Sequence, residues 1–165
     1  MQLSIDQIRN VALLSAFTDD ELRSLAQMGR LLKYEPYTSI VIEGESTWGM
    51  YLIVQGQVGI YKVNKLSGNV YDVGQLQAGS FFGEMSLVDS LPRSASVQSL
   101  TECTLLLIGK EEFQQFLGSA PERKMRFLEG CIQQLVGRLR TLNDDYVVSQ
   151  YQLWQKALKT GKEAA

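Results

Sequence analysis

Gly83, Glu84 and Arg93 are the residues whose types and spacing could bind an anionic ligand that also carries hydroxyl groups. Gly83 opens a predicted short turn of helix, whose first amides lack partners inside the helix and can donate to an anion. The Glu84 carboxylate can accept hydrogen bonds from a pair of neutral hydroxyls. Arg93 follows nine residues later, just before a predicted strand, and its planar guanidinium matches a phosphate. Each residue type is common alone, so the prediction depends on the combination.

The composition excludes several kinds of active site. The chain of 165 residues contains no His, which removes Ser-His-Asp triads, imidazole general bases and the most common metal ligand. A hydrolase acting on a nucleotide would need a general base and usually a metal cluster, and Glu84 alone supplies neither. A cupin-like enzyme would also need His ligands. We therefore expect no catalytic residues, no metal site and no enzyme activity.

The net charge argues against nucleic acid as the main partner. Sixteen Lys and Arg against 18 Asp and Glu give a formal charge of −2, the wrong sign for a protein that coats phosphate backbones. The basic run at 123–126 and the pair Arg138 and Arg140 are interpreted first as solvated faces of a long helix. A nucleic-acid patch is the alternative for both.

Two further features concern the cellular compartment. Cys103 and Cys131 lie 28 residues apart without a C-x-x-C pattern, which favours buried thiols in a reducing cytosol over a disulfide. The N-terminus lacks the features of a signal peptide, and no stretch approaches the roughly 18 apolar residues that a membrane helix needs. We expect a soluble cytoplasmic chain with no membrane span.

The elements that must position these residues fall into zones along the chain. Within residues 1–30, the capping boxes at 4–7 and 18–21 predict two short helices, and Gly29 is a plausible C-cap for the second. From residue 31 to 109 the hydrophobic period becomes two, and turn-forming residues, many of them glycines, interrupt it at intervals of no more than about twelve residues. This spacing is typical of an antiparallel barrel or jelly roll. The predicted strands are Ser39–Ile42, Met50–Val54, Val58–Val63, Val70–Val73, Ser96–Leu100 and Cys103–Ile108.

Helical spacing returns after Gly109. Residues 110–117 form one predicted helix, and a capping box at 119–122 with Pro121 in its first turn starts a long helix that reaches residue 158. Residues 159–165 are expected to be a frayed tail. Either the helix packs on its own β-domain or it forms the seam of a homodimer, because its apolar positions alternate spacings of four and three. These positions are Leu128, Ile132, Leu135, Leu139, Leu142 and Tyr146.

The segment around Glu84 and Arg93 resembles the phosphate-binding cassette of cyclic-nucleotide-binding domains. The family pattern is F-G-E, an apolar residue, a small residue and Leu, then a short spacer and P-R-small-A. It is met by Phe82-Gly83-Glu84-Met85-Ser86-Leu87 and Pro92-Arg93-Ser94-Ala95, with a spacing similar to that of protein kinase A regulatory subunits. Upstream, residues 43–45 and 50–58 are similar to a strand pair of the family. The resemblance covers roughly residues 15–140.

The resemblance implies a fold and a division of the chain. The fold is mainly β, an eight-stranded antiparallel β-roll of jelly-roll type with N-terminal helices and a long C-terminal helix. Residues 31–109 would be the β-roll, with the cassette at 82–95, and residues 110–158 would form the hinge and lid.

The family's binding residues can be carried over one at a time. Gly83 would offer its amide near the nucleotide, Glu84 would accept the ribose 2′-hydroxyl, and Arg93 would pair with the exocyclic oxygens of the cyclic phosphate. Small side chains at Ser86 and Ala95 would let the ligand approach. Met85 and Ser94 complete the predicted binding set.

The resemblance also implies a ligand and a kind of partner. The family position that corresponds to Ser94 is Ala in cAMP-selective kinase subunits, Thr in cGMP-dependent kinases and Ser in bacterial catabolite activators. We therefore expect cAMP as the ligand, with cGMP as the alternative.

A side chain of the long helix is expected to cap the base. The candidates are Arg140, Tyr146, Tyr151 and Trp154. No helix-turn-helix is recognisable after Pro121, which predicts a stand-alone sensor that signals to an effector protein or as a homodimer. The alternative function is an interaction module with a degenerate pocket.

Overall fold

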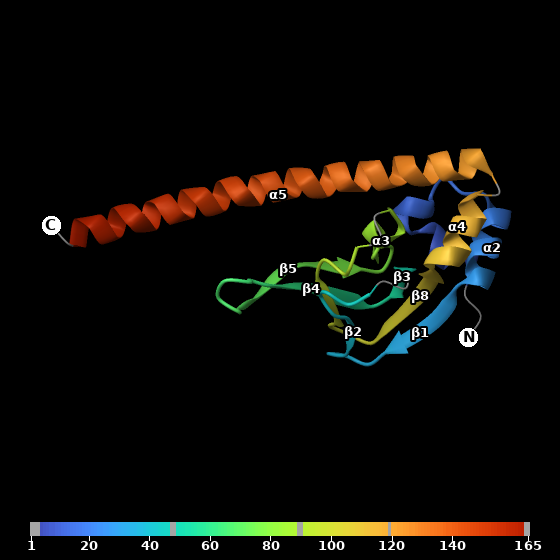
Figure 1. Ribbon diagram of the computed structural model, residues 1–165, viewed down its shortest axis with the longest axis horizontal. Helices are drawn as coiled ribbons and strands as arrows, with labels where there is room; N and C mark the ends of the chain where they lie inside the picture. The colour runs from blue at the N-terminus through green and yellow to red at the C-terminus, as the bar shows by residue number, and fades with distance from the viewer. Residues whose placement is uncertain (1–3, 47–48, 89–90, 119, 164–165) are drawn as a thin grey trace. The chain divides into compact units, whose positions relative to one another are not determined.

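Both predicted capping boxes form in the computed structural model of the chain (Figure 1). Helix α1 (Ile5–Arg9) begins after Ser4, and α2 (Asp19–Met28) begins after Thr18, with the short 3₁₀ helix η1 (Ala12–Leu14) between them. Gly29 does cap α2, but its backbone is extended. A Cβ there would lie 2.6 Å from Leu106 Cδ1, so the glycine allows the chain to pass close to the sheet.

The structure describes residues 4–46, 49–88, 91–118 and 120–163. They belong to two units, residues 1–128 and 129–165, and the boundary falls within helix α5 (Pro121–Glu163). The second unit is therefore a single helix over its described residues.

Eight strands form two four-stranded antiparallel sheets, which confirms the predicted β-roll with its N-terminal helices and long C-terminal helix. The strand orders are β1-β8-β3-β6 and β2-β7-β4-β5. All six strands predicted from hydrophobic period are present, with ends that differ by a few residues. Two more, β1 and β6, complete the sheets. The strands are β1 (Arg30–Tyr34), β2 (Ser39–Val41), β3 (Gly49–Gln55), β4 (Gln57–Val63), β5 (Val70–Gln77), β6 (Phe81–Phe82), β7 (Ser96–Ser99) and β8 (Cys103–Gly109).

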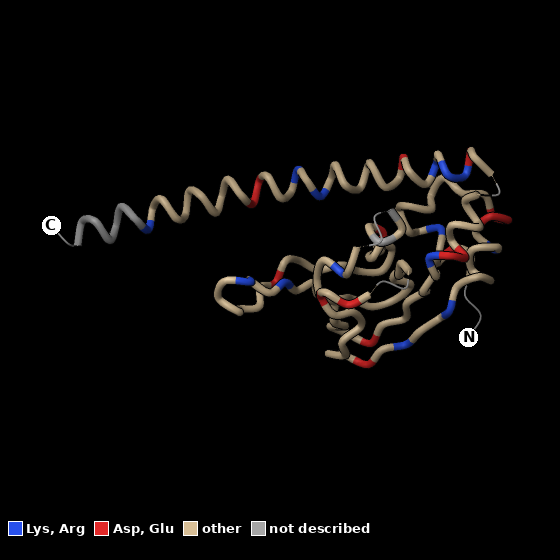
Figure 2. Tube along the Cα trace, in the orientation of Figure 1, with Lys and Arg blue, Asp and Glu red and all other residues tan. Residues whose placement is uncertain are grey.

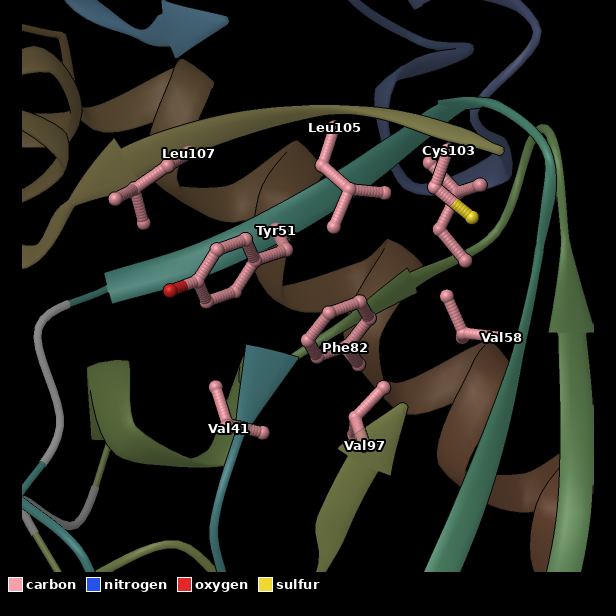
Figure 3. Packing of buried hydrophobic residues seen from close by; sticks show 9 residues of the cluster. Val41, Tyr51, Val58, Phe82, Val97, Cys103, Leu105 and Leu107 are labelled. Atoms are coloured by element: carbon pink, nitrogen blue, oxygen red, sulfur yellow. The ribbon is translucent and has the colours of Figure 1, made fainter. Parts of the chain in front are cut away.

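The core lies between the two sheets (Figure 3). Tyr51 on β3 stacks on Phe82 of β6, with ring centroids 4.9 Å apart and an interplanar angle of 10°. Val41 and Val97 face them from the second sheet, as Figure 3 shows. Because Phe82 directly precedes Gly83, this packing fixes the point at which the predicted cassette leaves the sheet.

The C-terminal zone differs from the prediction in one respect. Helix α4 (Lys110–Gly118) and helix α5 lie at the expected places, and Pro121 is the first residue of α5. Ser119, the expected capping residue, lies outside the described residues. The expected end at residue 158 was wrong, because α5 continues to Glu163. Helix-forming residues such as Lys159 and Lys162 favour continuation, and no proline interrupts it.

Cys103 and Cys131 are buried thiols and not a disulfide, as predicted. Among the helices of the described residues, none has the length and apolar character needed to traverse a lipid bilayer.

The interpretation of the basic run 123–126 as a solvated face was wrong for two of its residues. Arg123 and Arg126 converge on one carboxylate oxygen of Glu21, at 3.1 and 2.5 Å, and their side chains are only 20% and 32% exposed. The Arg123 guanidinium also donates to the Phe116 carbonyl at 2.6 Å and lies 4.2 Å from the centre of the Phe116 ring. Glu21 thus ties the first turns of α5 to α2. Figure 2 shows cations and anions interspersed along α5, which does not favour a nucleic-acid stripe.

We predict that Glu21→Gln lowers the free energy of unfolding by about 1–3 kcal/mol, because charge-assisted hydrogen bonds are lost. Burial raises the pKa of Glu21, but hydrogen bonds from Thr18 and Arg123 and the charge of Arg126 outweigh it and lower the pKa overall. A lowered pKa in the folded state means that the stabilisation is present above the ordinary value of 4.5 and disappears as the pH falls through the folded-state pKa. Thermal unfolding from pH 7 down to pH 3 tests this.

The matched control is Asp20→Asn, which removes the neighbouring carboxylate from a solvent-exposed pair with Arg23. That pair should contribute about 0–1 kcal/mol. Equal losses for the two variants, or a Glu21→Gln deficit that persists at pH 3, would contradict the assignment.

Candidate ligand-binding site

Gly83 sits at the junction of β6 and helix α3 (Met85–Val88), where only glycine fits. Its φ of +84° is one that side chains with a Cβ rarely adopt. A Cβ at this position would lie 2.2 Å from Arg93 Nη1 and 3.0 Å from the Gly49 carbonyl oxygen. The glycine predicted from the cassette therefore makes room for the guanidinium of the predicted arginine.

Arg93 is held at both its backbone and its side chain. Its backbone amide donates to the Glu45 carbonyl and its carbonyl accepts from the Gly44 amide, both at 2.9 Å. Its Nη2 donates to the Gly49 carbonyl at 2.8 Å, and the guanidinium lies 5.6 Å from the centre of the Tyr51 ring. The residue is only 7% exposed. The cation is thus fixed inside the roll.

The electrostatics of the site combine one buried cation with one buried carboxylate. Burial lowers the pKa of Arg93, while Tyr51 and Glu84 act in the opposite direction. Arginine stays protonated at any working pH, so the charge remains. Glu84 is also 7% exposed. Burial raises the pKa of Tyr51, against the lowering effect of Arg93, so its ring stays neutral beside the cation.

The other predicted site residues lie around this pair. Met85 is half-exposed, Ser94 is exposed and Ala95 is partly buried. The Ser94 hydroxyl lies 4.0 Å from the Met85 sulfur, so the two ends of the cassette meet. Ser86 belongs to α3, but its side chain lies outside what the structure describes.

The structure thus gathers the cassette residues at one place. The four candidates for the base cap, Arg140, Tyr146, Tyr151 and Trp154, belong to the second unit, so the base cap remains a prediction.

Sequence reasoning missed three residues next to the site. Gly49 supplies the carbonyl that Arg93 binds, and Tyr51 supplies the ring beside it. Lys62 on β4 donates to the Ser94 carbonyl at 2.6 Å. Gly49 and Tyr51 stand at the start of a recognisable strand, which could have drawn attention to them. No sequence pattern around Lys62 predicts a place in the site, because Lys62 comes close to the cassette only when β4 pairs with β7.

Residues 31–120 match the family described as the cyclic nucleotide-binding domain, which is more than half of the chain. The chain belongs to this family. A cAMP-dependent protein kinase regulatory subunit of Candida albicans is 33% identical over 117 residues, which cover 71% of this chain and 24% of that protein. The chain therefore spans about a quarter of the length of the curated relatives it matches.

Solved structures support the same fold. A cyclic nucleotide-binding domain from Methylobacillus flagellatus has a TM-score of 0.75 at 24% identity, covering 82% of this chain and 78% of that one. The regulatory domain of Toxoplasma gondii PKA, solved with cAMP, has a TM-score of 0.65 at 24% identity and covers 70% and 44% of the two chains. At this identity the likeness establishes the fold alone.

We predict that Gly83→Ala destabilises the protein more than Gly68→Ala does. Both positions have positive φ, +84° and +72°, so both variants carry about 1–2 kcal/mol of backbone strain. Only at Gly83 does the added Cβ meet Arg93, while nothing lies within 4 Å of a Cβ at Gly68. Displacing the guanidinium from Gly49 should cost about 1–3 kcal/mol more. Chemical unfolding of both variants measures the difference.

The same pair of substitutions in an Arg93→Ala background separates the two costs. There most of the excess at Gly83 should disappear, and only a small remainder is expected from the Gly49 carbonyl oxygen, which lies 3.0 Å from the added Cβ. Equal losses in the wild-type background would show that Arg93 does not depend on Gly83.

Proposed function

We propose that this chain is a cyclic mononucleotide sensor that binds cAMP in preference to cGMP and passes the signal to a partner without reacting with the nucleotide. The observation that carries the proposal is the buried Arg93, held against Gly83 with the buried Glu84 nearby. The planar guanidinium, held at a fixed place, matches the oxygens of an anionic phosphate in charge and geometry. The related cAMP-dependent kinase regulatory subunit and the PKA regulatory domain solved with cAMP point to the same ligand class.

Each cassette residue has a role in this proposal. Arg93 pairs with the exocyclic phosphate oxygens, worth about 1.5–3 kcal/mol net for a hydrogen bond to a charged group. Glu84 accepts the ribose 2′-hydroxyl, so a 2′-deoxyribose would leave its carboxylate unpaired. Gly83 donates its amide, and small residues at 86 and 95 permit close approach. Met85 and Ser94 line the more exposed side.

The base preference is supported by Ser94. A serine hydroxyl can serve the phosphate as well as a base, and serine at this position is found in bacterial activators that bind cAMP. This favours cAMP as the ligand over cGMP.

The proposed signal begins at α3 and reaches the helices that follow the roll. Leu87 of α3 lines a pocket of about 440 Å³ together with side chains of α4 and the first turns of α5. A movement of the cassette toward a bound phosphate would change the shape of this pocket. The α4–α5 junction would then shift and act as a hinge for the lid. The other lining residues are Phe113, Gln114, Leu117, Gly118, Lys124, Phe127 and Leu128.

The receiver of the signal is proposed to be an effector protein or a second copy of the chain. The second unit is a single helix over its described residues, so its apolar stripe has no other element of that unit to pack against. Leu135, Leu139 and Leu142 belong to this stripe. A partner helix would bury it.

We predict that saturating cAMP raises the Tm by about 5–11 °C. Ligand at a hundred times its Kd stabilises by about 2.7 kcal/mol, and a chain of this size gains about 2–4 °C per kcal/mol. The increase should be smaller with cGMP and absent with 5′-AMP. Arg93→Ala should abolish most of the increase, and Glu84→Ala should weaken it. Thermal melts of each protein with each nucleotide provide the measurement.

Arg23→Ala is the control, because Arg23 lies in α2 in a solvent-exposed pair. It should keep the full increase. No shift with either cyclic nucleotide would favour the interaction module with a degenerate pocket. Unaltered shifts in both Arg93→Ala and Glu84→Ala would move the binding site elsewhere.

We predict that nucleotide binding changes amide hydrogen exchange over residues 110–145, and that Leu87→Ala suppresses this change while leaving binding within a few-fold. The reason is that Leu87 is the cassette side chain in the pocket shared with α4. A ligand can shift the two states only through its differential affinity for them. Hydrogen exchange with and without saturating cAMP provides the measurement.

Leu91→Ala is the matched control, since Leu91 is a cassette leucine that is exposed and does not line the pocket. It should respond like the wild type. Identical exchange with and without bound nucleotide would contradict the switch even with binding intact. Repeating the experiment at two protein concentrations reports whether a second copy protects residues 129–156.

A further inference from the structure

We infer that Lys62 is a specificity-determining residue of the proposed nucleotide site, where its ammonium group recognises the acceptor edge of a guanine base. The inference rests on the proposed function, because it concerns the same pocket. Lys62 lies outside the cassette sequence and reaches it through space.

Sheet pairing places Lys62 beside the cassette. In the pairing of β4 with β7, Tyr61 is opposite Ser96, two residues after Ser94. Lys62 is the next residue along β4, and its Nζ donates to the Ser94 carbonyl at 2.6 Å. Ser94 directly follows Arg93. The ammonium group therefore contacts the residue that directly follows the cation proposed to hold the phosphate.

The exposure of the residues indicates which part of the ligand reaches Lys62. Arg93 and Glu84, the proposed phosphate and ribose partners, are each 7% exposed, whereas the Lys62 side chain is 51% exposed. Met85 and Ser94 are also exposed and approach each other where the two ends of the cassette meet. With its phosphate and ribose bound inside, a nucleotide must place its base on this more open side.

A neighbouring carboxylate limits what Lys62 can select. Glu43 lies 3.7 Å from the Lys62 ammonium and accepts a hydrogen bond from the Val63 amide at 3.0 Å. That backbone hydrogen bond, with the charges of Lys62 and Lys65, lowers the pKa of Glu43 and keeps it ionised. The pair is neutral overall, so it would not attract a second phosphate. What it offers is a directed donor, since an ammonium has three protons to donate.

The chemistry of the two bases gives the Lys62 ammonium donor a preference for guanine over adenine. Guanine presents two adjacent acceptors, O6 and N7, whereas adenine presents the N7 acceptor beside the N6 amino donor. An ammonium group cannot accept from the adenine amino group. Lys62 should therefore raise the affinity for cGMP relative to cAMP, opposing the cAMP preference attributed to Ser94.

The test measures Kd values of the full chain for cAMP, cGMP and cIMP by calorimetry, in the wild type and in Lys62→Met. Inosine shares O6 and N7 with guanine but lacks its 2-amino group, so cIMP reports on that edge without any contribution from the 2-amino group. Lys62→Met should weaken cGMP and cIMP by about tenfold, as expected for loss of a hydrogen bond to a base edge. Binding of cAMP should change by less than about twofold.

Lys65→Met is the matched control, because it removes an equal charge near Glu43 from the turn after β4. It should leave the ratio of cGMP to cAMP affinity unchanged, and Lys62→Arg, which keeps a donor, should retain most of that ratio. An unchanged ratio in Lys62→Met, or a loss of cIMP binding no larger than that of cAMP, would overturn the inference while leaving the proposed function standing. Failure of the wild type to bind any cyclic nucleotide would overturn both.

Discussion

The hydrogen bond from Arg93 to the Gly49 carbonyl is the interaction on which the site depends. A buried guanidinium needs acceptors, and here one of them is a backbone carbonyl at the start of β3. Because the backbone cannot move without disturbing the sheet, the cation is fixed at a defined place in the roll. Gly83 must then lack a side chain, since a Cβ there would take the space of Nη1. The cassette motif thus meets a packing requirement, in addition to the binding role proposed for it.

Much of the fold could be predicted from the sequence because its signals are local. The capping boxes at Ser4 and Thr18, and Pro121 at the start of α5, depend on residues only a few positions apart. Strands with clear alternation were also found. Strand β6 was missed because two residues show no period, and it exists only by pairing with β3. The helix end was misplaced because small and basic residues near residue 160 are compatible with either helix or coil.

The candidate site was predictable in its chemistry but not in its contacts. The cassette residues Gly83, Glu84 and Arg93 stand close in sequence, and the structure places them together. Their partners are far away along the chain: Gly49 is 44 residues before Arg93, and Lys62 is 32 residues before Ser94. Such contacts follow from strand register, which composition and spacing do not encode at this range. The basic run is a related case, because Arg123 and Arg126 contact a glutamate more than a hundred residues earlier through helices α5 and α2, and that contact also depends on tertiary structure.

The long-range contacts of Arg123, Arg126 and Lys62 share one physical feature. In each, a carboxylate near the start or end of an element lies beside a cation from elsewhere in the chain. Glu21 in the first turn of α2 holds two arginines of α5, and Glu43 just after β2 stands beside Lys62. Both carboxylates also accept hydrogen bonds from backbone amides, of Thr18 and Val63, which restrict their movement before any cation arrives. A carboxylate fixed in this way loses less conformational entropy when it forms an ion pair with a cation. Partly buried pairs of this kind can therefore order a contact between two elements where freely moving surface pairs would not. In this chain the two places ordered in this way are the start of α5, beside α2, and the approach of β4 to the cassette.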